Sequence, residues 1–134
     1  PLFFDTAQIS AGKAMKQVGL PLDGIDFFEY HDVFSIYAAL QLEAVGFAIK
    51  GSGWKLAAEG AIGLKGRIPC ATMGGMKARG FPGGAAGVYQ AVEATLQLRG
   101  QAGKNQAEGA RFGLIQSLGG PASTAVSHIL TNNG

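Results

Sequence analysis

The apolar residues of this chain recur with two periods, one typical of helices and the other of strands. The helical period is clearest at 85–98, where one apolar face of an amphipathic helix is formed by Ala85, Val88, Tyr89, Val92 and Leu96. Weaker helical signals mark 7–18, 33–45 and 54–59. Short apolar runs at 25–30, 68–71, 110–117 and 124–130 predict strands.

Capping residues and turn residues set the expected boundaries of these elements. Thr6 is a suitable N-cap for the first helix and Gly19 a suitable stop. Asp32 is placed to cap the helix at 33–45, which is apolar nearly all round and is therefore expected to be internal. A tight turn is expected at 118–121. The alternation of strands and helices, closed by two consecutive strands, predicts an α/β domain in which helices cover a mixed sheet.

Composition limits the classes of protein. At 134 residues, with 47% hydrophobic and 15% charged residues, the chain is expected to form one globular domain. A net charge of +2 from scattered basic residues gives no argument for nucleic acid, and no apolar run approaches the ~18 residues that span a bilayer. The single cysteine favours a reducing, cytoplasmic setting, and two isolated histidines predict no metal site. A start at Pro1 is compatible with removal of the initiator Met or with a fragment of a longer chain.

A glycine-rich loop precedes the helix at 85–98. Its glycines are Gly74, Gly75, Gly80, Gly83 and Gly84. Glycine lets the backbone pass close to a ligand, and a helix N-terminus suits an anion or a developing oxyanion. The alternative is a tight connection with no ligand. The loop is not a Walker A sequence, because Phe81 and Pro82 stand where Lys and Ser or Thr are needed.

The ends of the predicted strands are the expected places for chemistry. His31 is the strongest candidate, since it follows a strand and precedes a helix, although a surface or capping histidine is an alternative. His128 is expected to be a packed or edge residue and Cys70 a small buried hydrophobe. Lys77 and Arg79 are compatible with a phosphate or with a solvated loop face. The aromatic residues expected in the core are Phe27, Phe28, Phe34, Tyr37 and Trp54.

Three segments together resemble motifs of the C-terminal half of thiolases, in order and spacing. They are His-Asp-Val-Phe-Ser at 31–35, the glycine-rich segment at 74–87 and Gln-Leu-Arg-Gly at 97–100. The resemblance covers roughly residues 7–130 and is greatest to the sterol-carrier-protein type and its archaeal and bacterial relatives. It implies a thiolase-like C-terminal domain of βαβαβαββ topology over residues 1–134, as a fragment or half of a longer protein.

The resemblance also implies site residues and partners. His31 corresponds to the histidine of the family's His-Asp-x-Phe motif and would hold a thioester oxygen, while Gly119 and Gly120 would bring backbone N–H groups to a second oxyanion site. Ser117 stands near the family's last-loop cysteine. The expected substrate-binding positions are Gly74, Gly75, Phe81, Gly83 and Gly120. The implied substrate is an acyl-CoA thioester, with no cofactor. The implied partners are an N-terminal thiolase half, whose cysteine is the nucleophile, further copies of the protein, and an OB-fold acyl-CoA-binding protein.

Departures from the family pattern leave two classes of function open. Phe81 replaces the histidine that activates the nucleophile, Ser117 replaces a cysteine, and Val33 replaces the cysteine that follows His-Asp in the sterol-carrier type. One reading is an acyltransferase of the acetyl-CoA acetyltransferase kind with altered catalytic residues, or a CoA-thioester retro-aldol lyase. The other is a non-catalytic thiolase-fold subunit that binds acyl-CoA or scaffolds a partner.

Overall fold

A three-stranded mixed sheet forms the centre of the computed structural model, which describes residues 3–132. Strand β1 (Phe27–Glu29) pairs parallel with β2 (Phe112–Gly119), and β2 pairs antiparallel with β3 (Thr124–Thr131). The strand order is β1-β2-β3, so the long β2 is central. The prediction of a mixed sheet that ends in two neighbouring strands is confirmed.

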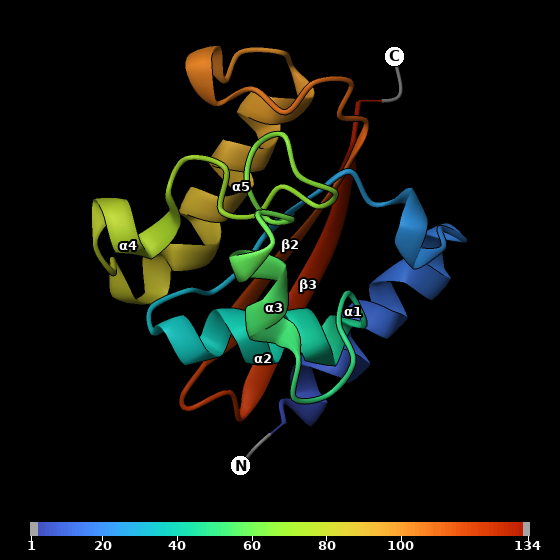
Figure 1. Ribbon diagram of the computed structural model, residues 1–134, viewed down its shortest axis with the longest axis vertical. Coiled ribbons are helices and arrows are strands. Elements are labelled where there is room, and N and C mark those ends of the chain that lie inside the picture. The colour runs from blue at the N-terminus through green and yellow to red at the C-terminus, as the bar shows by residue number, and fades with distance from the viewer. Residues whose placement is uncertain (1–2, 133–134) are drawn as a thin grey trace.

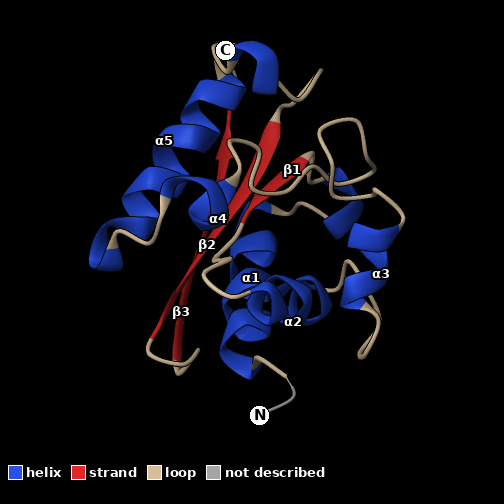
Figure 2. Ribbon diagram, turned by 60° about the vertical axis from the view of Figure 1, so that its left-hand side comes forward, coloured by secondary structure: helices blue, strands red, loops and turns tan. Residues whose placement is uncertain are grey.

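Helices cover both faces of this sheet. Helix α5 (Ala86–Leu98) packs on one face, and α1 (Asp5–Val18) with α2 (Ser35–Val45) on the other, as Figures 1 and 2 show. The remaining helical elements are α3 (Gly53–Ala58), α4 (Gly75–Arg79), and the 3₁₀ turns η1 (Leu22–Gly24), η2 (Gly83–Ala85) and η3 (Gly103–Asn105). The predicted α/β class is therefore confirmed, with three layers.

Side chains alternate in direction along each strand, so the core is divided between the two faces of the sheet. Phe28 and Leu114 pack in the cluster that α1 and α2 cover, whereas Phe27 and Ile115 pack against α5. Successive side chains of a strand point to opposite faces, so two consecutive apolar residues serve both layers. This arrangement explains why the neighbouring Phe27 and Phe28 are both fully buried.

The predicted strand at 68–71 is wrong: within residues 3–132, this segment contributes a single parallel bridge between Phe28 and Cys70. Phe28 donates to the Pro69 carbonyl at 2.8 Å and accepts from the Ala71 N–H at 3.0 Å. Pro69 has no N–H to extend the pairing. Ala71 then turns away with a φ of 45°, which leads the chain into the glycine-rich loop.

Two predicted caps are also wrong. Helix α2 begins after Phe34 with no side-chain cap, because the Asp32 carboxylate accepts hydrogen bonds from another segment of the chain. Thr6 lies inside α1, and its hydroxyl donates to the Ala122 carbonyl at 2.7 Å. In both cases a long-range partner takes the side chain that local sequence assigned to a cap.

The core prediction fails at Trp54 and Phe34, which are 59% and 58% exposed. Helix α2 is likewise buried only in its second half, since Ile36 near its start is 59% exposed. The predicted turn at 118–121 lies two residues later, because β2 continues to Gly119. Among residues 3–132, no helix is long and apolar enough to cross a membrane.

Candidate functional site

His31 lies two residues beyond the end of β1 and is held there by a buried glutamine from α2. The Gln41 side chain accepts from the His31 N–H at 3.0 Å and donates to the His31 carbonyl at 2.7 Å. Gln41 is fully buried and His31 is 4% exposed. Both backbone groups of His31 are therefore satisfied by one side chain, which fixes the position of the residue where the strand has ended.

The imidazole of His31 meets the end of β2. The Leu118 N–H donates to its Nδ1 over 3.5 Å, at the long limit of a hydrogen bond. Burial lowers the pKa of His31, and the nearby negative charge of Asp32 opposes this by raising it. A neutral imidazole that accepts at Nδ1 carries its proton on Nε2. His31 is thus a neutral donor, suited to hold an oxygen that develops negative charge.

Phe81 faces the same imidazole. The two rings are 5.5 Å apart between centroids and meet nearly edge-on, at 75°. Phe81 is nevertheless 54% exposed. The aromatic ring therefore covers one side of His31 without closing it off, and it adds no group that titrates.

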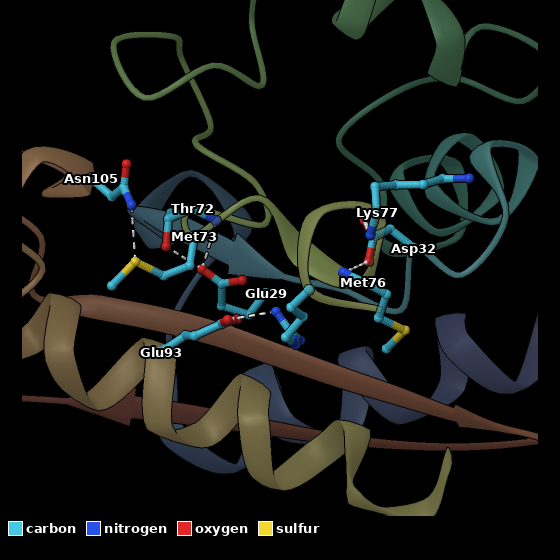
Figure 3. Close-up of polar contacts among 9 residues, drawn as sticks. Glu29, Asp32, Thr72, Met73, Met76, Lys77, Glu93 and Asn105 are labelled. Atoms are coloured by element: carbon cyan, nitrogen blue, oxygen red, sulfur yellow. Dashed lines mark hydrogen bonds and ion pairs between the residues drawn. The ribbon is translucent and has the colours of Figure 1, made fainter. Parts of the chain in front are cut away.

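The glycine-rich loop owes part of its sequence to the neighbouring Asp32. The Asp32 carboxylate accepts from the Met76 N–H at 2.8 Å and from the Lys77 N–H at 3.4 Å, at the start of α4 (Figure 3). Gly75 has a φ of 61°, and a Cβ added there would overlap this carboxylate. Gly75 is buried, so close packing against Asp32 explains this glycine without a ligand.

Ser117 and the two following glycines do not form the expected loop. Ser117 and Gly119 are residues of β2, paired with Val126 and Thr124, and only Gly120 lies in the turn. Successive N–H groups of a strand point to opposite edges, so the N–H beside His31 is that of Leu118. Leu118 is a site residue that the sequence did not indicate, because nothing local distinguishes a strand N–H that meets a distant imidazole.

Ser117 lines a separate cavity of about 380 Å³ between the start of α5 and the sheet. Gly84 and Gly87 line the same cavity, and so does His128. Helix α5 approaches the sheet closely at Gly87, where an added Cβ would be in van der Waals contact with that of Ser117, at 3.4 Å. The prediction that His128 is an edge residue agrees with its place on β3.

Gly74 and Gly83 are exposed and flank α4 and Phe81. The side chains of the two basic residues between them contact other groups of the protein. Lys77 donates to the Val33 carbonyl at 3.4 Å, and Arg79 pairs with Glu93 at 2.5 Å. Arg79 is therefore paired within the protein and is not part of a fully solvated loop face, and Glu93 is the partner that sequence reasoning missed.

Cys70 is only partly buried and packs against the core cluster. Burial raises the pKa of its thiol well above the ordinary value, Glu29 raises it further, and Arg67 opposes the shift. Such a thiol is a poor nucleophile. Within residues 3–132, no three His, Cys, Asp or Glu side chains are grouped so as to hold a metal ion.

Comparison with known proteins gives one consistent result. The family described as thiolase C-terminal domain-like matches residues 1–132. The acetyl-CoA acetyltransferase of Methanothermobacter thermautotrophicus is 43% identical over 127 residues, which cover 95% of this chain and 33% of that protein. Sterol carrier protein 2 of Homo sapiens is 38% identical over 116 residues, or 87% of this chain and 21% of that protein.

A solved structure has the same fold. The protein described as Ltp2-ChsH2(DUF35) aldolase matches with a TM-score of 0.84 at 26% identity, over 96% of this chain and 32% of that chain. This chain therefore spans about a third or less of the length of these relatives.

Proposed function

The chain belongs to the thiolase C-terminal domain-like family, and on this premise we propose that it is the C-terminal domain of an acyl-CoA acyltransferase of the acetyl-CoA acetyltransferase kind. In this proposal residues 1–134 form one thiolase domain of a longer protein, whose N-terminal half carries the nucleophilic cysteine. The observation that carries the proposal is the neutral, clamped imidazole of His31 beyond the end of β1.

The proposed role of His31 is to hold the thioester oxygen of the substrate. Attack on a thioester carbonyl moves negative charge onto that oxygen, and the Nε2–H of His31 donates to it. A preorganised donor of this kind typically stabilises the transition state by about 3 kcal/mol. Gln41 fixes the backbone of His31, and the Leu118 N–H favours the tautomer with the proton on Nε2, so the donor is held in position before the reaction begins.

Phe81 is the reason to propose altered chemistry. A side chain that takes a proton from a thiol must titrate near neutral pH, and phenylalanine does not titrate. The N–H of Gly120, in the turn after β2, is kept as a proposed secondary donor of the site. Ser117 lines a separate cavity, and the Gly119 N–H points to the edge of β2 opposite that of Leu118. Gly74, Phe81 and Gly83, which are exposed, are proposed to line the path of the acyl-CoA, whereas Gly75 is buried against Asp32.

A second candidate is retro-aldol cleavage of a CoA thioester, which the exposed Phe81 ring beside His31 favours. The hydroxyl proton of a β-hydroxyacyl thioester passes to a base supplied by the rest of the full-length protein, the Cα–Cβ bond breaks, and Cβ leaves as a carbonyl. The electron pair forms a thioester enolate, whose oxygen accepts from His31, and Cα then takes back the proton from the protonated base. The similar solved structure is described as an aldolase. A non-catalytic subunit that binds acyl-CoA is the third outcome to be tested.

The proposed partners follow from the exposed apolar face of α5. Val88, Tyr89 and Val92 are 64%, 47% and 52% exposed, although they are the apolar face of that helix. We assign this face to the N-terminal half of the thiolase, and propose that the full protein forms homo-oligomers. An OB-fold acyl-CoA-binding protein is a further proposed partner, and a cytoplasmic location is proposed from the single cysteine.

The test is product analysis of the protein at its natural length, with acetoacetyl-CoA and with a β-hydroxyacyl-CoA. Acyl transfer to free CoA supports the acyltransferase, and cleavage to a carbonyl product without added CoA supports the lyase. Binding of acyl-CoA with neither product supports the non-catalytic subunit. A matched His31→Ala variant should lose turnover in either enzymatic case, whereas Lys104→Ala, at an exposed position, should not.

A further inference from the structure

Two buried carboxyl groups lie beneath the glycine-rich loop, outside the candidate site. Glu29 on β1 is 1% exposed and Glu93 on α5 is 7% exposed. Figure 3 shows these two side chains close together between β1, the loop and α5. Each enters the electrostatic surroundings of the other. Carboxylates are rarely so buried unless they are paired, so this arrangement needs a physical reason.

The two carboxyl groups bind the two ends of one segment. Glu29 Oε1 accepts from the Thr72 N–H at 2.9 Å and from its hydroxyl at 2.5 Å. Glu93 Oε1 pairs with the Arg79 guanidinium at 2.5 Å. Thr72 lies where the chain enters the glycine-rich loop, and Arg79 is the last residue of α4, two positions before Phe81.

The geometry of the pair favours one shared proton. Among the described residues, Glu93 Oε2 is buried with no hydrogen-bond partner, and so is Arg79 Nε beside it, while the Glu29 side chain lies within hydrogen-bonding reach of Glu93. A second carboxylate beside it would supply no donor, whereas a protonated Glu29 donates to Glu93 and still accepts from Thr72 through its other oxygen. We propose that Glu29 and Glu93 are positioning residues that share one proton and thereby hold the glycine-rich loop, with Phe81, against His31.

The charges around the pair agree with this assignment. Burial raises the pKa of Glu29 to about 7; the Thr72 hydrogen bonds oppose the shift, and Glu93 adds to it. Burial also raises the pKa of Glu93, against the opposing effect of Arg79. The other groups that face the pair are Asp32 and Tyr30 from the β1 side, Cys70 from the adjoining segment, and Tyr89, whose ring contacts Arg79.

A second ionisation therefore destabilises the loop. When Glu29 loses its proton, the group carries three negative charges, on Glu29, Glu93 and Asp32. Within this group, Arg79 alone supplies a positive charge to oppose them. The hydrogen bond to Glu93 is lost at the same time. The segment 72–80 is then expected to open more often as pH rises through about 7. The shared proton concerns the position of the loop and goes beyond the proposed reaction. Its test is therefore independent of the test of the proposed function.

Hydrogen exchange of the 72–80 amides tests the proposal in the protein at its natural length, at about pH 5.5 and about pH 8.5, corrected for intrinsic exchange. The wild type should lose roughly tenfold protection at the higher pH. Glu29→Gln should stay protected at both, because its amide accepts from Thr72 and donates to Glu93. Glu93→Gln should lose protection at both, and Glu59→Gln, at an exposed position, should behave as wild type.

A side-chain titration keeps the test decisive if a variant fails to fold. Carbon-13 NMR of labelled glutamate in the wild type should show a carboxyl group that titrates near pH 7. Wild-type protection of 72–80 that is independent of pH would overturn the proposal. So would an unchanged pH dependence in Glu29→Gln, or the absence of any glutamate that titrates near neutral pH.

Discussion

The Leu118 N–H donates to Nδ1 of His31, although 87 residues separate the two in sequence. This contact joins the end of β2 to a residue two positions beyond the end of β1, its parallel neighbour. It leaves the proton of a neutral imidazole on Nε2. The candidate site is therefore built by sheet pairing, and the chemistry proposed for His31 depends on this tautomer.

Gln41→Leu should damage both stability and activity. The change leaves the buried N–H and carbonyl of His31 without partners, which costs about 1–3 kcal/mol for each unsatisfied group. Urea unfolding should show the loss, and kcat/KM should fall because His31 is no longer fixed. Gln8→Leu, at an exposed position of α1, is the control. Equal effects of the two variants would contradict the assigned role of Gln41.

Gly75→Ala and Gly12→Ala should have opposite effects on stability. At Gly75, with a φ of 61°, alanine would be strained by at least ~1 kcal/mol and would also displace the Asp32 carboxylate. At Gly12, inside α1 with open space around it, alanine should stabilise by about 0.5–1 kcal/mol. Thermal unfolding measures both, and a neutral Gly75→Ala would show that the loop adapts.

The free energy of unfolding should fall as pH rises through about 7. The pKa of Glu29 is raised in the folded state from 4.5 to about 7, so folding favours its protonated form. That contribution is complete below 4.5 and is lost as pH passes the folded value. In Glu29→Gln this part of the pH dependence should disappear. Denaturant unfolding across this range makes the comparison, and parallel curves for the two proteins would contradict it.

Much of the fold could be predicted from the apolar residues, because α5, β2 and β3 carry recognisable patterns and α1 and α2 weaker ones that Gly19 and Gly46 delimit. Helix α5 shows the limit of this reasoning. Its buried face includes Gln90, Glu93 and Gln97, whose side chains bond to the Gln116 carbonyl, to Arg79 and to the Asn105 carbonyl. These partners lie far away in sequence or in a loop, so no local pattern indicates them.

The candidate site likewise combines residues that the sequence indicates with residues that only the fold brings together. His31 could be predicted because it follows an apolar run and precedes a helix. The sequence of residues 68–71 did not exclude a strand. Only one bridge forms because the backbone turns away at Ala71, and the sequence does not indicate this turn. Leu118 and Glu93 act through contacts that only the folded chain brings together.

The exposed face of α5 predicts self-association of the 134-residue chain made alone. Without its proposed N-terminal partner, this face should drive dimers or aggregates through apolar contact. Val88→Ser with Val92→Ser should reduce the association, while Val18→Ser, 51% exposed on α1, should not. Sedimentation at several concentrations measures this. A monomer at high concentration that binds no hydrophobic dye would contradict the prediction.

Steady-state thiolysis of acetoacetyl-CoA by the protein at its natural length, compared among wild type, His31→Ala and Phe81→His, tests the account most directly. General-base assistance is typically worth ~10²–10⁴-fold, so the wild type should be slow because Phe81 supplies no base. His31→Ala should abolish the remaining turnover, and Phe81→His should partly restore thiolysis if the nucleophile is intact. Robust wild-type turnover that survives His31→Ala would show that the chemistry lies on other residues.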